Sequence, residues 1–155
     1  MILKTSMTSK LRLLLAFALA SCMQLAAAET ALITRSVNVR SGPNVALPTV
    51  TWLMTGTRVT VLGCISNWSW CDVTSGRERG WIYSRYLSMP FQGTAMTIVA
   101  GGPALGLPVV EFALGPYWDE HYQGRLWFAQ KAQWQLRWDQ LPAPREWREP
   151  ASRGS

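Results

Sequence analysis

Two cysteines seven positions apart, Cys64 and Cys71, are the residues whose type and spacing most clearly predict chemistry in this chain. The chain has three cysteines, and the third, Cys22, lies far upstream beside an apolar run. A structural zinc site needs about four ligands, and no other cysteine or histidine stands near the pair. An even pair of cysteines in an oxidising compartment is normally oxidised. We therefore expect a Cys64–Cys71 disulfide and no metal.

The one histidine, His121, is the only side chain with an ordinary pKa near neutrality. It directly follows Asp119 and Glu120, and at most two of three adjacent residues share a helix face. Nucleophilic catalysis needs a serine or cysteine held beside its base by a pocket, and the sequence contains no such arrangement. We expect no catalytic residue, no metal and no cofactor. A hydrolase that depends on His121 is the disfavoured alternative.

Aromatic side chains are stronger candidates for a binding site, because a flat ring combines a large contact area with a polar edge. Five of them gather in a short stretch: Trp68, Trp70, Trp81, Tyr83 and Tyr86. Core packing competes with ligand binding for each ring. Packing is the preferred interpretation for Trp81, whereas Trp68 falls in a predicted turn and is the ring least easily explained by burial.

Residues 1–28 have the pattern of a secretory signal peptide. They hold three basic residues and no acid, and the apolar run 13–19 is shorter than the about 20 residues of a membrane span. Small residues before Glu29 fit ordinary signal peptidase, whereas the run that ends at Cys22 resembles the lipobox of bacterial lipoproteins. The spacing favours cleavage before Glu29, and lipidation at Cys22 stays open. We expect an exported protein, periplasmic or extracellular, or else lipid-anchored to the envelope.

The net charge argues against nucleic acid as a partner. The whole chain carries +6, but three of its fifteen basic residues and none of its nine acids lie in residues 1–28. The remaining twelve basic and nine acidic residues leave +3 from residue 29 onward. An excess this small is not the basic surface that nucleic-acid binding requires.

Residues 31–88 have the pattern of short β-strands. The run 58–62 alternates with a period of two, and similar runs are separated by turn residues, which predicts a small barrel or sandwich. Pairing the two cysteines predicts a hairpin with a two-residue turn at Asn67–Trp68, or else a wider loop. The same pairing predicts a bulge near Gly63.

The remaining chain predicts other kinds of structure. Residues 89–108 are rich in glycine and proline and are expected to be a linker, with a short strand at 97–99. Residues 109–141 predict a strand at 109–112 and short helices. Residues 142–155 hold three prolines and are expected to be a disordered tail.

Tryptophan is dense in the helical stretch. Trp127, Trp134 and Trp138 fall on one predicted helix face from residue 127 to 141, behind a short helix over 117–122 that contains Trp118. Docking of this face on its own domain is the preferred interpretation. A partner interface is the alternative.

The segment 36–43, SVNVRSGP, resembles the opening signature of bacterial SH3 domains. GTRVTV at 56–61, WCDV at 70–73, GWI at 80–82 and the closing Tyr86–Leu87 are similar to the family's later strands and follow in the same order. The resemblance implies a mainly β protein with a small SH3-like β-barrel over 31–88, followed by a short α-containing C-terminal extension. Part of that extension is similar to one seen on some secreted proteobacterial members.

The resemblance implies a binding module, because bacterial SH3 domains are commonly targeting modules of cell-wall hydrolases. The expected function is non-catalytic binding of peptidoglycan or its stem peptides by the aromatic rings. Arg40, inside the signature, is expected to hold loop carbonyls or to contact the ligand. The alternative is an adapter or inhibitor that contacts an envelope protein through Trp118, Trp127, Trp134 and Trp138.

Overall fold

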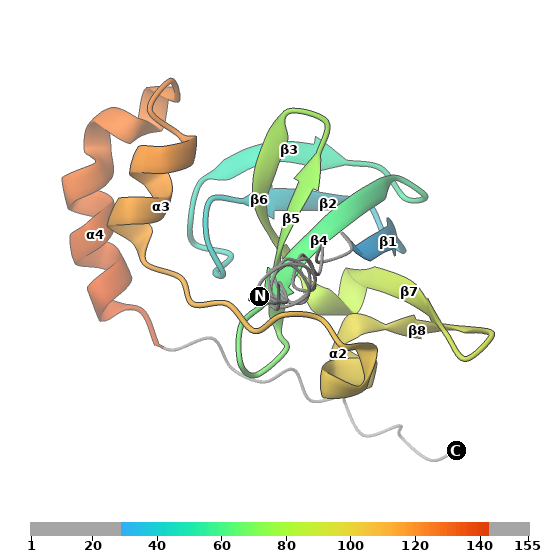
Figure 1. Ribbon diagram of the computed structural model, residues 1–155. Helices are drawn as coiled ribbons and strands as arrows, with labels where there is room; N and C mark the ends of the chain where they lie inside the picture. Colours follow the sequence, from blue (N-terminus) through green and yellow to red (C-terminus); the bar gives the residue numbers. More distant parts are fainter. Residues whose placement is uncertain (1–28, 143–155) are drawn as a thin grey trace, which may run out of the picture.

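The computed structural model describes residues 29–142 (Figure 1). Its strands are β1 (Glu29–Ile33), β2 (Val37–Arg40), β3 (Thr49–Leu53), β4 (Arg58–Cys64), β5 (Trp70–Ser75), β6 (Glu78–Tyr83), β7 (Leu87–Phe91) and β8 (Thr94–Thr97). They form one antiparallel sheet in the order β3-β2-β6-β5-β4-β1-β7-β8. The sheet has the SH3-like fold expected from the sequence, but the barrel is not closed, because β3 and β8 remain its two edges. The signal-peptide prediction lies outside the described residues, as do residues 143–155 of the predicted tail.

Alternation in β4 produces the inner face of the sheet. Val59 and Val61 are 2% exposed, whereas Thr60 and Leu62 between and after them are half-buried. The predicted bulge is confirmed: the register with β5 shifts between Val61 and Gly63. Val61 is opposite Val73, and Gly63 is opposite Asp72. The extra residue allows both valines and Cys64 to point into the core.

The β4–β5 hairpin contains the predicted disulfide between Cys64 and Cys71. Its tip is the wider of the two predicted loops. The Ile65 N–H donates to the Trp70 carbonyl at 3.0 Å, and the Trp68 N–H donates to the Ile65 carbonyl at 2.8 Å. Trp68 takes the left-handed conformation, with φ of 60°, that a non-glycine residue rarely adopts.

Residues 89–108 are not a linker. They contain the end of β7, all of β8, helix α2 (Ile98–Gly101) and the 3-10 helix η2 (Gly102–Leu105). Ile98 is fully buried in the core, and it begins a helix where a strand was expected. The glycines serve local turns instead: Gly93, with φ of 81°, closes the β7–β8 hairpin, and Gly106, with φ of 69°, ends η2.

The C-terminal extension consists of α3 (Leu114–His121), the 3-10 helix η3 (Leu126–Gln130) and α4 (Lys131–Gln140). The single helical stretch expected from 127 to 141 is therefore divided, and Trp127 lies in η3. Residues 109–112 form no strand, only one parallel bridge between Val109 and Cys64. Figure 1 shows α3 and α4 packed together beside the barrel, away from α2 and β8.

Barrel and extension share one hydrophobic core. Leu114, Trp118 and Tyr122 of the extension are at most 2% exposed and belong to the same buried cluster as Val39 and Val73 of the sheet. The helices thus complete the core that a barrel of this size lacks by itself. Within residues 29–142, no helix is both long and apolar enough to cross a membrane.

Candidate functional site

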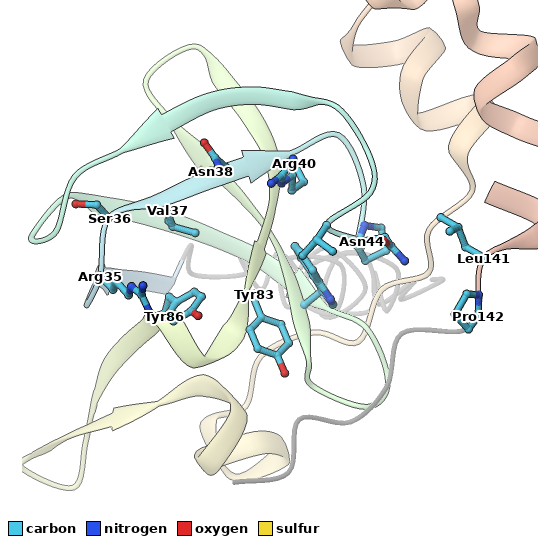
Figure 2. Close-up of a pocket in the computed structure, with 13 residues that line it drawn as sticks. Arg35, Ser36, Val37, Asn38, Arg40, Asn44, Tyr83, Tyr86, Leu141 and Pro142 are labelled. Atoms are coloured by element: carbon cyan, nitrogen blue, oxygen red, sulfur yellow. The ribbon is translucent and has the colours of Figure 1, made fainter. Parts of the chain in front are cut away.

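A groove of about 710 Å³ lies between β2 and the aromatic side chains of β5, β6 and the 3-10 helix η1 (Ser84–Tyr86) (Figure 2). We call it the aromatic groove. It is lined by Arg35, Ser36, Val37, Asn38, Arg40, Pro43, Asn44, Val45, Trp70, Tyr83, Tyr86, Leu141 and Pro142. Figure 2 shows Arg35 and Tyr86 at one end of the groove and Leu141 and Pro142 at the other, with Tyr83 between them.

Three rings follow one another along one wall. The ring centroids of Trp70 and Tyr83 are 5.5 Å apart, and those of Tyr83 and Tyr86 are 6.0 Å apart. Trp70 is 7% exposed, whereas both tyrosines are half-buried. Burial raises the pKa of Tyr83, an effect that the nearby Arg85 charge opposes. Its hydroxyl therefore stays protonated at neutral pH and can both donate and accept hydrogen bonds.

Arg40 has the structural role considered for it in the sequence. Its Nη1 donates to the Leu47 carbonyl at 3.2 Å and to the Thr49 hydroxyl at 3.1 Å. These bonds connect β2 to the end of the loop that follows it. The same side chain lines the aromatic groove, so Arg40 shapes the wall and is also within reach of a ligand.

The loop after β2 is fixed from behind by the extension. The Trp118 Nε1–H of α3 donates to the Ser41 carbonyl at 2.8 Å, and the Ser41 N–H donates to the Pro48 carbonyl at 2.9 Å. A Cβ at Gly42 would stand 2.4 Å from Leu47 Cδ1 and 2.5 Å from Phe112 Cζ, so any larger residue there would have to displace these side chains. The extension is thus part of the construction of the groove.

The family model of the bacterial SH3 domain matches residues 35–88. This chain contains a bacterial SH3 domain. Apart from Leu141 and Pro142, all residues that line the groove lie within the matched range. No curated protein and no solved structure gives a significant match to the chain.

Two of the five aromatic candidates in the SH3 domain lie outside the groove. Trp81 is 1% exposed and packs edge-on against Phe112, with ring centroids 5.4 Å apart, and against Tyr117 at 5.9 Å. It is a core residue covered by the extension and is not available to a ligand. Trp68 is half-buried, and its indole lies over the backbone of Gly102. Trp70, Tyr83 and Tyr86 are the candidates that the fold brings together.

The tryptophans of the extension pack on the SH3 domain, as the preferred interpretation held. Trp118 is fully buried, so it is not a partner contact. Its ring centroid lies 4.6 Å from that of Trp127 and 6.3 Å from that of Trp134. Trp138 packs against Phe112 at 5.0 Å. These tryptophans therefore pack against the barrel core and cover it.

A buried polar cluster fastens α3 to strands β5 and β6. Asp72, 3% exposed, accepts hydrogen bonds from Arg79, the shortest at 2.7 Å, and from the Tyr117 hydroxyl at 2.8 Å. The hydrogen bond to Asp72 raises the pKa of Arg79, and burial raises the pKa of Tyr117. The Tyr122 hydroxyl donates to the Arg79 carbonyl at 2.9 Å. We call Asp72, Arg79 and Tyr117 the polar latch.

His121 lies beside this latch and not in the groove. Its ring centroid is 4.6 Å from that of Tyr117, and its Nε2 is 3.7 Å from Glu120 Oε2. Burial lowers the pKa of His121, and the charge of Arg79 lowers it further. Among residues 29–142, no three histidine, cysteine or acidic side chains are grouped so as to hold a metal ion.

Sequence reasoning missed several residues of the groove. Arg35 immediately precedes the family signature, and the exposed Asn38 lies inside it, so both could have been found by reading β2 as one side of a site. Leu141 and Pro142 carried no such signal, because their position depends on where α4 ends against the barrel.

Proposed function

We propose that this chain is an exported, non-catalytic envelope protein whose bacterial SH3 domain binds peptidoglycan through its stem peptides in the aromatic groove. The observation that carries the proposal is the succession of Trp70, Tyr83 and Tyr86 along a groove of about 710 Å³. This volume is in the range of sites for small ligands. The family match adds support, since bacterial SH3 domains often bind cell-wall ligands.

The groove offers two kinds of contact to a peptide. The rings of Tyr83 and Tyr86 provide flat apolar area with little entropy to lose, because each side chain has only two rotatable torsions. Asn38 and Asn44 provide amide groups on the facing wall. The Asn44 Oδ1 already accepts the Ala46 N–H at 2.8 Å, which leaves its amino group to donate to a ligand. The tyrosine rings would supply most of the binding affinity, and the asparagine amides would fix the orientation of the peptide.

Export is part of the proposal. Mass spectrometry of the intact protein from native envelopes tests it: an unmodified chain that begins at Glu29 supports cleavage by ordinary signal peptidase. The mass of a lipid-modified chain that begins at Cys22 would mean that the protein is anchored to a membrane by its lipid. A mass that retains residues 1–28 would contradict export by either route.

Co-sedimentation of the exported protein with purified sacculi tests the binding. We expect Tyr86→Ala to weaken binding about tenfold, because a stacked ring typically contributes on the order of 1 kcal/mol. Trp52→Ala is the matched control, since Trp52 is 55% exposed on β3 and lies outside the groove. Absence of binding by a folded, oxidised protein would sink the proposal.

An adapter role through the Trp-rich extension has weaker support. Its tryptophans are engaged with the SH3 domain, and the large apolar side chains it leaves most exposed are Leu126, at 96%, and Leu136, at 65%. If sacculi fail to bind the protein, these two residues are where a protein partner should be sought.

A further inference from the structure

The charged residues that line the aromatic groove are all basic. Arg35 and Arg40 line it, and none of its 13 lining residues is acidic. Arg85 stands beside it on η1, with its guanidinium 5.7 Å from the centre of the Tyr86 ring. The Arg35 guanidinium lies 5.8 Å from the same ring. Two cations thus flank one tyrosine at one end of the groove.

Three acidic residues form ion pairs with basic residues that do not line the groove. Asp72 pairs with Arg79, Glu78 with Arg125, and Asp119 with Lys131. All three pairs lie where the extension meets the barrel or within the extension itself. Within residues 29–142, neither Arg35 nor Arg40 has a carboxylate partner.

Both arginines keep donors for a ligand. The two hydrogen bonds of Arg40 use Nη1 alone, so its Nε and Nη2 groups have no partner among the described residues. Arg35 is exposed, and no ion pair joins it to another of the described residues. A guanidinium edge matches a carboxylate with two parallel hydrogen bonds.

We propose that the aromatic groove recognises a carboxylate of its peptide ligand, with Arg35 as the contact beside Tyr86 and Arg40 as a second donor further along the groove. The inference rests on the proposed function and adds to it which chemical group of the peptide the groove recognises. Stem peptides whose carboxylates are free bind, and stem peptides in which they are amidated bind weakly. The groove therefore distinguishes two chemical states of the same wall.

The test is titration of the exported protein with two synthetic muramoyl peptides that differ only in having free or fully amidated carboxylates. We expect the free acid to bind at least about tenfold more tightly at low salt, as a charge-assisted bidentate contact supplies. The difference should shrink at high salt, because the arginines are near the surface. Arg35→Gln should remove most of the preference.

Arg77→Gln is the matched control, since Arg77 is exposed in the turn after β5, outside the groove, and its loss changes the net charge equally. Equal affinity for the two peptides would overturn the carboxylate inference and leave the proposed function standing. A preference that Arg35→Gln leaves intact would overturn its assignment to this groove. No binding of either peptide by folded protein would sink both proposals.

Discussion

Trp81 and Trp118 are two buried tryptophans in different polar surroundings. Trp118 is fully buried, and its Nε1–H donates to the Ser41 carbonyl at 2.8 Å. Trp81 is 1% exposed, and its Nε1 has no hydrogen-bond partner among the described residues. Replacement by phenylalanine removes a similar volume from each, but only at position 118 does it leave a carbonyl unpaired.

We predict that Trp118→Phe lowers the free energy of unfolding by about 1 kcal/mol more than Trp81→Phe does. Urea unfolding followed by far-UV circular dichroism measures both losses in the same background. Equal losses would mean that the Trp118–Ser41 bond contributes nothing net to stability.

His121 gives the protein a predictable response to acid. Because burial lowers its pKa in the folded chain below the ordinary 6.5, the unfolded chain binds the proton first. The free energy of unfolding should therefore fall as the pH drops below about 6.5, and this contribution should be fully regained above it. Unfolding at pH 7.5 and at pH 5, compared between the native protein and His121→Gln, measures it. A difference between the two proteins that does not change with pH would contradict the prediction.

At the residue scale, the sequence predicts pairings that depend on type and short spacing. The disulfide is the clear case, because Cys64 and Cys71 are only seven positions apart. The burial of Trp81 is different, since it depends on Phe112 and Tyr117 folding back over the barrel. No local pattern around Trp81 contains that information.

At the scale of elements, the β4–β5 hairpin has a covalent and a non-covalent restraint. The disulfide closes its tip. The Cys64 backbone is also hydrogen-bonded to the segment 108–110, with the Cys64 N–H donating to the Pro108 carbonyl at 2.9 Å. The Val110 N–H donates back to the Cys64 carbonyl at 2.9 Å. Loss of the disulfide removes the first restraint and leaves the second in place.

We predict that Cys64→Ser/Cys71→Ser lowers the free energy of unfolding by about 2.5 kcal/mol, the chain-entropy value for a loop of about eight residues. Chemical unfolding with and without reductant measures the effect. Reductant should lower the stability of the native protein but not that of the double variant. A double variant whose unfolding midpoint equals that of the oxidised native protein would contradict the prediction.

Some elements of the fold can be predicted from the sequence and others cannot. The strand runs of β4 and β5 were recognisable because alternation and β-branched residues specify a half-buried strand. The segment 89–108 is different, because its glycine and proline content predicts a linker, whereas Gly93 and Gly106 form specific turns. The burial of Ile98 beneath the sheet is a tertiary fact that composition does not contain.

At the scale of the whole molecule, the SH3 domain and its extension share one buried core, so we expect them to unfold together. A chain that ends at residue 90 would lose Ile98, Leu114 and Trp118, each at most 1% exposed, and would uncover Trp81 and Asp72. Burial of each large apolar side chain contributes roughly 1.5–3 kcal/mol, and a domain's total stability is only about 5–15 kcal/mol.

We predict that this truncated chain shows no cooperative thermal transition, whereas a chain that ends at residue 142 retains one. Thermal unfolding followed by near-UV circular dichroism measures both. A cooperative transition at an unchanged temperature in the shorter chain would show that the barrel is independent of the extension. The same result decides whether truncation can be used to map ligand binding, since loss of binding by an unfolded barrel would carry no information.

The sequence predicts a barrel and an extension separated by a linker, and no pattern in it shows that the three parts pack together. The contacts that join the parts span long separations, as in the Tyr117–Asp72 bond between residues 45 positions apart. Periodicity reports which face of an element is buried, but not which other element covers it.

Strand β1 has the first place in the described chain and an interior place in the sheet. It pairs with β4 on one side and with β7 on the other. A ribosome releases the N-terminus first, at about 5–20 residues per second. Each new β1 must therefore wait, for several seconds at that pace, until its second neighbour has been made. The nascent protein stays without its native sheet until β7 has been made, a delay that would suit the export proposed above, because a chain must stay unfolded to pass through a narrow channel.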